Sequence, residues 1–173
     1  MKTSAGFILI KNIVAIVVVM LSLLACSHNK ILQNKHSEKM MTVSQFLFFD
    51  GNCQQAMAFY KTCLGGTLTI TPVSETPMKA GFPPSMHNRI INARLTANGV
   101  DISACDWMRP DETFTRGNMN CLYISGGSRE ETRRIFDLLA EHANVTDPLN
   151  IQPFGYYGAL NDQFGVRWMF HAE

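Results

Sequence analysis

The sequence contains two copies of a unit in which an apolar strand, a short turn and an amphipathic helix follow one another. The first copy, FLFFDGNCQQAMAFYKTCLGG, begins at Phe46 and ends at Gly66. Its apolar strand stops at an Asp-Gly-Asn turn, and apolar side chains then recur at the three- and four-residue spacing of a helix face. The second copy spans residues 119–140. One such unit leaves a sheet face uncovered, so the two copies are expected to combine.

Three strands are predicted after each helix, which gives the order strand, helix and three strands twice. This order differs from the alternating strands and helices of a doubly wound parallel sheet. It predicts an α+β fold with one helix on one face of each small mixed sheet. The predicted strands are 43–49, 67–73, 89–96, 100–106, 118–124, 145–151, 154–160 and 164–171, and the predicted helices are 52–63 and 128–141.

Local signals support these boundaries. Asn52 and Ser128 are good N-caps for the two helices, and Glu131 stands at the capping-box position relative to Ser128. Asn98-Gly99 is a hairpin signal between two strands. Residues 74–88 form a long loop with three prolines, and loops of this length are usually functional or mobile.

The N-terminal segment is typical of a secretory signal peptide. Lys2 and Lys11 precede an apolar run of thirteen residues, from Ile13 to Ala25, and no acidic residue occurs before Cys26. At ~1.5 Å per residue this run is too short to cross a hydrocarbon core of ~30 Å. Leu-Leu-Ala-Cys at 23–26 resembles a bacterial lipobox, in which the cysteine is acylated. An ordinary signal peptide and a short membrane anchor are the alternatives.

We therefore expect a protein of the cell envelope that is attached to the lipid bilayer through acyl chains on Cys26. Ser27 follows this cysteine, and in a Gram-negative lipoprotein a residue other than aspartate there permits transfer to the outer membrane. The expected organisation is a lipoprotein signal peptide at 1–25, an acylated N-terminus and polar tether at 26–41, and a domain at 42–173 with modules 43–106 and 118–171.

Charge and cysteine content exclude several function classes. The chain has 15 basic and 14 acidic residues, and loss of the signal peptide would remove two lysines and leave 13 basic residues. No basic run suggests nucleic acid as a partner.

Cys53 and Cys63 are ten residues apart on one predicted helix, which separates them by about 15 Å along the helix axis. This distance is too long for a disulfide. These two cysteines, Cys105 and Cys121 are expected to be small buried residues.

Three longer stretches resemble a known family. FFDGNCQQAMAFYKTCLGG, NARLTANGVDISACD and YGALNDQFGVRWMF are similar to motifs of the PhnB-like branch of the glyoxalase/bleomycin-resistance (vicinal oxygen chelate) superfamily. The resemblance covers about residues 43–171 and implies two βαβββ modules that form an open cupped barrel. Superfamily members often work as homodimers. A methyltransferase role is also attached to this branch, but no Gly-rich nucleotide-binding turn follows a predicted strand.

The superfamily resemblance also implies four positions in the cup that hold a metal in many members. They fall on Gln45, on Ser103 or Cys105, on Met119 or Asn120, and on Met169. Thioethers and neutral amides are poor ligands for the hard or borderline ions of this chemistry. The PhnB-like motif histidine is Asn92 in this chain. We therefore expect no catalytic metal and no other cofactor.

These features favour a module that binds an unidentified small molecule in its cup without a metal. The alternative is a divalent-metal-dependent lyase, isomerase or dioxygenase, for which His87 would have to move in from the long loop. A third hypothesis is an interaction protein that uses the fold as a scaffold. No catalytic residue is assigned. The candidate cup residues are Gln45, Asn92, Arg94, Ser103, Cys105, Tyr123 and Trp168.

The lipobox generates a direct test. Cys26→Ala should release the protein from the membrane fraction or leave an unprocessed precursor, because the acyl chains would have no attachment site. Fractionation and the mass of the processed chain would measure this. Unchanged membrane association with normal processing would contradict lipidation at Cys26.

Overall fold

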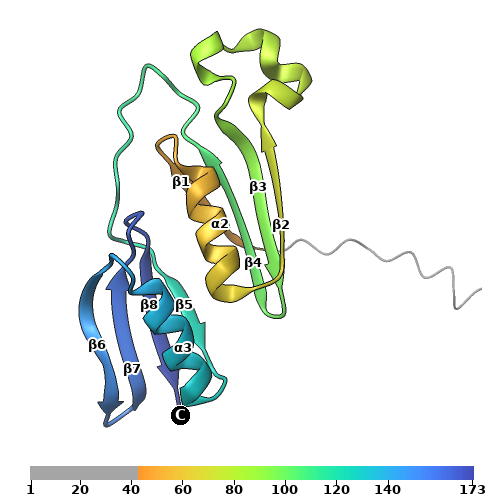
Figure 1. The fold of residues 1–173 in the computed structure, drawn as a ribbon. Coiled ribbons are helices and arrows are strands. Elements are labelled where there is room, and N and C mark those ends of the chain that lie inside the picture. The colour runs from red at the N-terminus through yellow and green to blue at the C-terminus, as the bar shows by residue number, and fades with distance from the viewer. Residues whose placement is uncertain (1–42) are drawn as a thin grey trace, which may run out of the picture. The chain divides into compact units, whose positions relative to one another are not determined.

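A computed structural model describes residues 43–173, which belong to one structural unit. The expected signal peptide, Cys26 and the tether lie outside the described residues. In the first module the elements are β1 (Gln45–Phe49), α2 (Cys53–Leu64), β2 (Thr67–Pro72), β3 (Ile90–Ala97) and β4 (Val100–Asp106). In the second they are β5 (Leu122–Ser125), α3 (Arg129–Leu139), β6 (Asn144–Gln152), β7 (Gly155–Asn161) and β8 (Arg167–Ala172) (Figure 1).

Each module builds its own mixed four-stranded sheet. The strand orders are β1-β4-β3-β2 and β5-β8-β7-β6. The first strand of each module pairs parallel with the last, whereas the remaining pairs are antiparallel. Among the described residues the two sheets stay separate, so they do not close into a barrel. The predicted α+β fold with two βαβββ modules is therefore confirmed.

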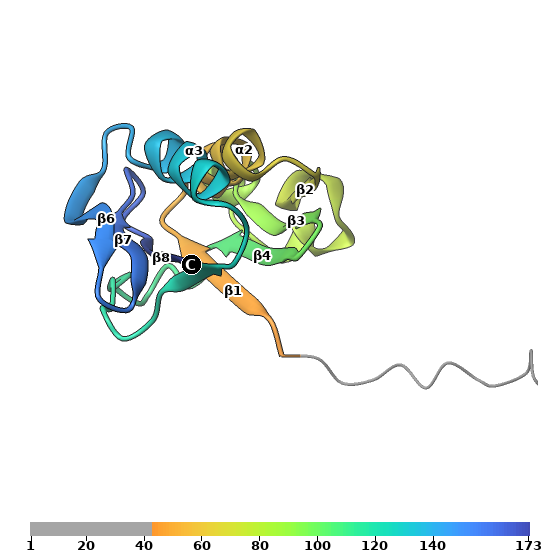
Figure 2. The same cartoon turned by 90° about the horizontal axis from the view of Figure 1, so that it is seen from below.

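Each sheet has one face toward a helix and one open face. On β3, Ala93 and Leu95 are buried, whereas Asn92 and Arg94, which alternate with them, are exposed, as expected for a half-buried strand. The two helices contact each other and lie on the same side of the sheets (Figure 2). The apolar core therefore lies between helices and sheets, and the opposite faces remain open.

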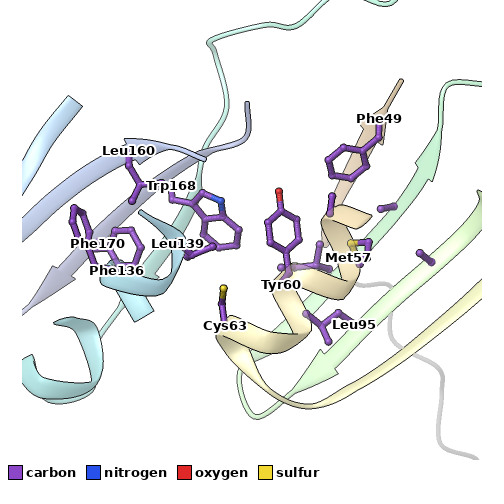
Figure 3. Packing of buried hydrophobic residues seen from close by; sticks show 14 of the residues in the cluster. Phe49, Met57, Tyr60, Cys63, Leu95, Phe136, Leu139, Leu160, Trp168 and Phe170 are labelled. Atoms are coloured by element: carbon purple, nitrogen blue, oxygen red, sulfur yellow. The ribbon is translucent and has the colours of Figure 1, made fainter. Parts of the chain in front are cut away.

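Aromatic side chains join the two modules. Tyr60 on α2 and Trp168 on β8 are fully buried and point toward one another, with ring centroids 5.3 Å apart (Figure 3). Phe164, which precedes β8, packs edge-on against Tyr60 and Phe49 at 6.1 and 6.5 Å. Such edge-to-face pairs add to the burial of apolar area. The first module's helix and the second module's last strand thus share one core.

The carboxylate of Asp162 lies inside this core and is 5% exposed. One oxygen accepts hydrogen bonds from the Tyr60 hydroxyl at 2.7 Å and from the Trp168 indole nitrogen at 2.8 Å. The other accepts from the backbone N–H groups of Phe164 and Val166, both at 2.9 Å. Residues 162–168, DQFGVRW within the third family-like stretch, thus build a turn around a buried carboxylate that connects the modules.

A second buried carboxylate caps α2. Asn52 was expected to be the N-cap, but its side chain makes no capping bond. Asp106 at the end of β4 accepts from the Cys53 N–H at 2.9 Å and from the Ile90 N–H at 2.7 Å. Asn52 occupies the N-cap position as expected, but the capping side chain comes from β4 and not from the local turn. At α3 the expectation is confirmed, since the Ser128 hydroxyl accepts from the Glu131 N–H at 3.2 Å.

Several boundaries differ from the predicted ones. The strand predicted at 118–124 is Leu122–Ser125, since residues 118–121 belong to the connection between the modules. The segment predicted as a weak strand at 145–151 is the nine-residue β6. The Pro-rich loop contains three short 3-10 helices, η1 (Val73–Glu75), η2 (Pro77–Gly81) and η3 (Pro84–Met86). The four cysteines of the described part are free thiols.

None of the helices in residues 43–173 combines the length and the apolar character that a membrane crossing requires.

The buried carboxylate of Asp162 predicts a large loss of stability on amidation. Asp162→Asn should lower the free energy of unfolding by about 2–4 kcal/mol, because an amide nitrogen would face N–H and O–H donors in a buried site. Urea unfolding followed by tryptophan fluorescence would measure the loss. Asp101→Asn, which alters an exposed ion pair with Arg94, is the matched control and should leave the midpoint nearly unchanged. Equal midpoints for both variants would contradict a structural role for Asp162.

Candidate functional site

A cavity of about 540 Å³ lies beside β1. Its walls come from β1, from the connection between the modules and from the turn that precedes β8. Cavities of roughly 300–1,000 Å³ are typical of small-molecule sites. The lining residues are Gln45–Asp50, Asn52, Trp107, Glu112–Gly117, Met119–Leu122 and Phe164–Arg167.

One wall of the cavity is aromatic. Phe46 and Phe48 on β1 are 44% and 49% exposed, although both are large apolar side chains on a strand. Trp107, directly after β4, packs edge-on against Phe48 at 5.6 Å, and Phe114 in the connection packs on Trp107 at 6.1 Å. The Trp107 indole N–H donates to the carbonyl oxygen of Glu112 at 3.2 Å. These contacts fold the connection back toward β1 and give the cavity a flat, apolar side.

The cavity also contains four charged residues, Asp50, Glu112, Arg116 and Arg167. They come from the end of β1, from the connection and from the start of β8. Thr113, Thr115 and Asn120 add neutral polar groups. An apolar wall combined with a few charged and polar groups is the usual composition of a site that orients a small molecule.

Of the seven residues expected to line the cup, only Gln45 borders this cavity. Asn92, Arg94 and Ser103 lie on the open face of the first sheet instead. Arg94 donates two hydrogen bonds to Asp101, both 2.8 Å long. Its guanidinium group is therefore already paired with an exposed carboxylate.

The other three expected residues are placed differently. Tyr123 is 56% exposed on the open face of the second sheet, opposite Met169. Cys105 is 7% exposed, opposite Phe48 on the first sheet. Trp168 is 1% exposed because its indole belongs to the core beside Asp162.

Strand alternation explains the position of Gln45. Phe49, four residues on, packs into the core, so Gln45 and Leu47 share the helix-facing side of β1. Phe46 and Phe48 occupy the open face, opposite Ser103 and Cys105. A count along a strand that is one residue off moves every side chain to the other face. Gln45, the expected first metal ligand, therefore faces the helix side, and the neighbouring open-face position on β1 is Phe46.

The donor set of the open faces does not fit a divalent metal ion. The parallel pairs β1–β4 and β5–β8 carry Phe46, Ser103, Tyr123 and Met169 there. The Cys121 thiol donates a hydrogen bond to the Met169 sulfur at 3.3 Å. Both sulfur atoms are soft ligands, and this contact contains no carboxylate that a hard ion would need. Within residues 43–173, no three histidine, cysteine, aspartate or glutamate side chains lie close enough to hold a metal together.

His87, which the metal alternative would require, and His171 on β8 both have other neighbours. The His87 Nε2 lies 3.1 Å from the carbonyl oxygen of Phe82 within the Pro-rich loop. The His171 Nε2 lies 2.9 Å from the carbonyl oxygen of Phe154. Neither residue lines the cavity beside β1.

The buried thiols are not activated nucleophiles. Burial raises the pKa of Cys63 and the pKa of Cys105 to about 11, and the carboxylate of Asp106 adds to the effect on Cys105. Burial also raises the pKa of Cys53. Burial, followed by the nearby Asp162 carboxylate, raises the pKa of Tyr60 and keeps its hydroxyl protonated. These groups therefore stay neutral at physiological pH, as structural side chains do.

Sequence reasoning missed most of the cavity. Trp107, Phe114, Arg116 and Arg167 were not among the expected site residues, although all four line it. The signal that could have found Trp107, Phe114 and Arg116 is the segment between the modules, where aromatic and basic residues interrupt a polar stretch at 107–117. A connection of this length is a common location for binding residues.

Comparison with known proteins identifies the family. Residues 41–170 match the family model described as 3-demethylubiquinone-9 3-methyltransferase. The chain belongs to this family. Protein YjdN of Escherichia coli (strain K12) is 28% identical over 142 residues, which cover 76% of this chain and 95% of that protein.

Solved structures agree with the family assignment. Protein PA1353 from Pseudomonas aeruginosa has a TM-score of 0.70 and 29% identity, covering 78% of this chain and 98% of that one. A putative 3-demethylubiquinone-9 3-methyltransferase, PhnB protein, from Bacillus cereus has a TM-score of 0.63 and 27% identity, and the match covers 77% of this chain and 100% of that one. The fold is shared by a glyoxylase/bleomycin resistance protein/dioxygenase domain from Frankia. That domain has 16% identity and a TM-score of 0.53, and the match covers 78% of this chain and 93% of that one. The resemblance to the PhnB-like branch is therefore confirmed.

The cavity geometry predicts selective labelling of one thiol. Cys121 borders the cavity and is half-buried, whereas Cys53, Cys63 and Cys105 are buried. At about pH 8, iodoacetamide should modify Cys121 several-fold faster than these three, because access limits alkylation. Peptide mass spectrometry over time would give each rate. Equal rates for all four would mean that the core opens faster than the reagent reacts.

Proposed function

We propose that this chain binds a small organic molecule in the cavity beside β1, without a catalytic metal. The observation that carries the proposal is the aromatic wall of Phe46, Phe48 and Trp107 on a cavity of about 540 Å³. Two phenylalanines that are nearly half exposed on one strand form a surface that water solvates poorly. Burial of such a surface by an apolar ligand would be favourable at ~25 cal/mol per Å².

A metal-dependent reaction of the glyoxalase type is the alternative, and the donor set argues against it. Phe46 and Met169 stand on the open faces where carboxylate or imidazole ligands would be needed. The manganese-bound fosfomycin resistance protein from Listeria monocytogenes has a similar fold with a TM-score of 0.53, but its 11% identity carries no ligand residue to this chain.

Methyl transfer is named in the family description and has little support from the site. Nucleotide-type cofactors usually bind at the carboxyl edge of an open parallel sheet, beside a Gly-rich turn. The described residues form two mixed sheets in which only β1–β4 and β5–β8 are parallel pairs. A pure interaction scaffold is also less well supported, because the cavity is not filled by side chains.

We further propose that the binding domain is tethered to a membrane through acylated Cys26. The Leu-Leu-Ala-Cys sequence at 23–26 supports this placement, which would put the cavity at the cell envelope. The segment 27–41 would reach about 50 Å when fully extended at ~3.4 Å per residue. A domain on such a tether could sample molecules near the membrane without being inserted into it.

The proposal predicts binding of a neutral apolar probe. N-phenylnaphthylamine, which fluoresces in apolar surroundings, should bind the purified protein with saturation, and Phe48→Ala should weaken binding about fivefold to tenfold through loss of the aromatic wall. Phe154→Ala is the matched control, because Phe154 is 63% exposed and lies outside the cavity. Fluorescence titration would give both dissociation constants. Equal weakening by the two substitutions, or no saturable binding, would refute the proposal.

The absence of a catalytic metal is tested separately. Protein incubated with nickel, zinc, manganese and iron and then dialysed should retain none of these ions in stoichiometric amounts. Elemental analysis would measure retention. One tightly held ion per chain would restore the enzyme hypothesis.

A further inference from the structure

The charges around the cavity are not balanced. Both acidic residues of the lining have basic partners outside it: Asp50 lies 3.5 Å from the guanidinium of Arg89, and Glu112 lies 3.0 Å from that of Arg109. These pairs are exposed and contribute little to stability, but they neutralise the two carboxylates locally. The acidic residues therefore leave little net negative potential in the cavity.

The two basic residues of the lining lack comparable partners. Arg167 has one acidic neighbour, Asp147, at the long distance of 4.0 Å. Arg116 takes part in no ion pair among residues 43–173. The cavity thus contains two guanidinium groups whose donors are available, beside an apolar wall.

Both arginines lie at the turn before β8. Arg167 follows the turn directly, and the Arg116 side chain lies over Gly165 within it. A Cβ atom at position 165 would lie 2.8 Å from Arg116 Nη1 and 3.2 Å from its Cζ, so the absence of a side chain there makes room for the guanidinium. Gly165 also has a φ of +84°, which other residues rarely adopt.

We infer that the cavity selects apolar organic anions, with the ring or hydrocarbon body on Phe46, Phe48 and Trp107 and the oxyanion group at Arg116 and Arg167. This inference rests on the proposed function and adds the charge class of the ligand to it. A guanidinium fork matches the oxygen spacing of a carboxylate, sulfonate or phosphonate. Arg116 is exposed and Arg167 is half-buried, so this pairing is open to screening by salt. Cations of the same shape would meet only carboxylates that already have partners.

A pair of dyes with the same body tests the charge class. Anilinonaphthalene sulfonate and N-phenylnaphthylamine share the anilinonaphthalene skeleton, and only the first carries a sulfonate. The purified full-length chain should bind the anion about tenfold more tightly than the neutral dye, and this preference should shrink as salt is added. Fluorescence titrations at low and high salt would give the ratio of the two dissociation constants.

Substitutions then locate the effect. Arg116→Gln and Arg167→Gln should each weaken sulfonate binding about fivefold and leave binding of the neutral dye within about twofold. Lys61→Gln removes the same charge from the exposed face of α2, outside the cavity, and should change neither constant. Arg116→Lys should recover part of the affinity, because it keeps the charge but loses the fork.

The outcomes separate the two proposals. If neither dye binds with saturation, the proposed function fails and the charge inference fails with it. If both dyes bind equally and the arginine variants change neither, the binding function stands and the selection of anions is refuted. If Lys61→Gln weakens sulfonate binding as much as Arg116→Gln does, the preference is a general charge effect and the assignment to the cavity is refuted.

Discussion

The fold depends on one buried carboxylate. Asp162 accepts hydrogen bonds from α2 through Tyr60, from β8 through Trp168, and from the backbone of its own turn. An unpaired charge at this depth would cost several kcal/mol, and here each carboxylate oxygen accepts two bonds. Because the donors come from both modules, the same interaction that satisfies the charge also fixes how the modules meet.

The turn around the Asp162 carboxylate also forms part of the cavity wall. The turn that begins at Asp162 continues into Phe164, Gly165 and Val166, all of which line the cavity, and then into Arg167. One side of the turn faces the core and the other faces the candidate ligand site. The start of β8, which carries Arg167, is therefore positioned by backbone bonds to a buried group, and the Arg116 side chain lies against the same turn. Sites supported in this way lose little entropy when a ligand is bound.

The fold was largely predictable because its signals are local and repeated. The twin strand–turn–helix units, the Asn98-Gly99 hairpin and the Ser128 cap act within a few residues of one another. The cap of α2 was missed because its carboxylate, on Asp106, is 53 positions from Cys53. Most of the cavity lining was missed for a similar reason. Its walls combine β1 with the non-periodic connection 107–121, and no spacing rule indicates which side chains of a connection fold back onto a strand.

The parallel pairing of β1 with β4 has a consequence for how the cavity is made during synthesis. Gln45 pairs with Ile102, so the strand that carries Phe46 and Phe48 leaves the ribosome long before β4, its partner in the described sheet, exists. The same delay recurs in the second module, where Leu122 pairs with Trp168. Long-range pairings of this kind form late, since the intervening chain must be ordered first. The aromatic wall is thus among the first parts of the domain to be translated and among the last to be held in place.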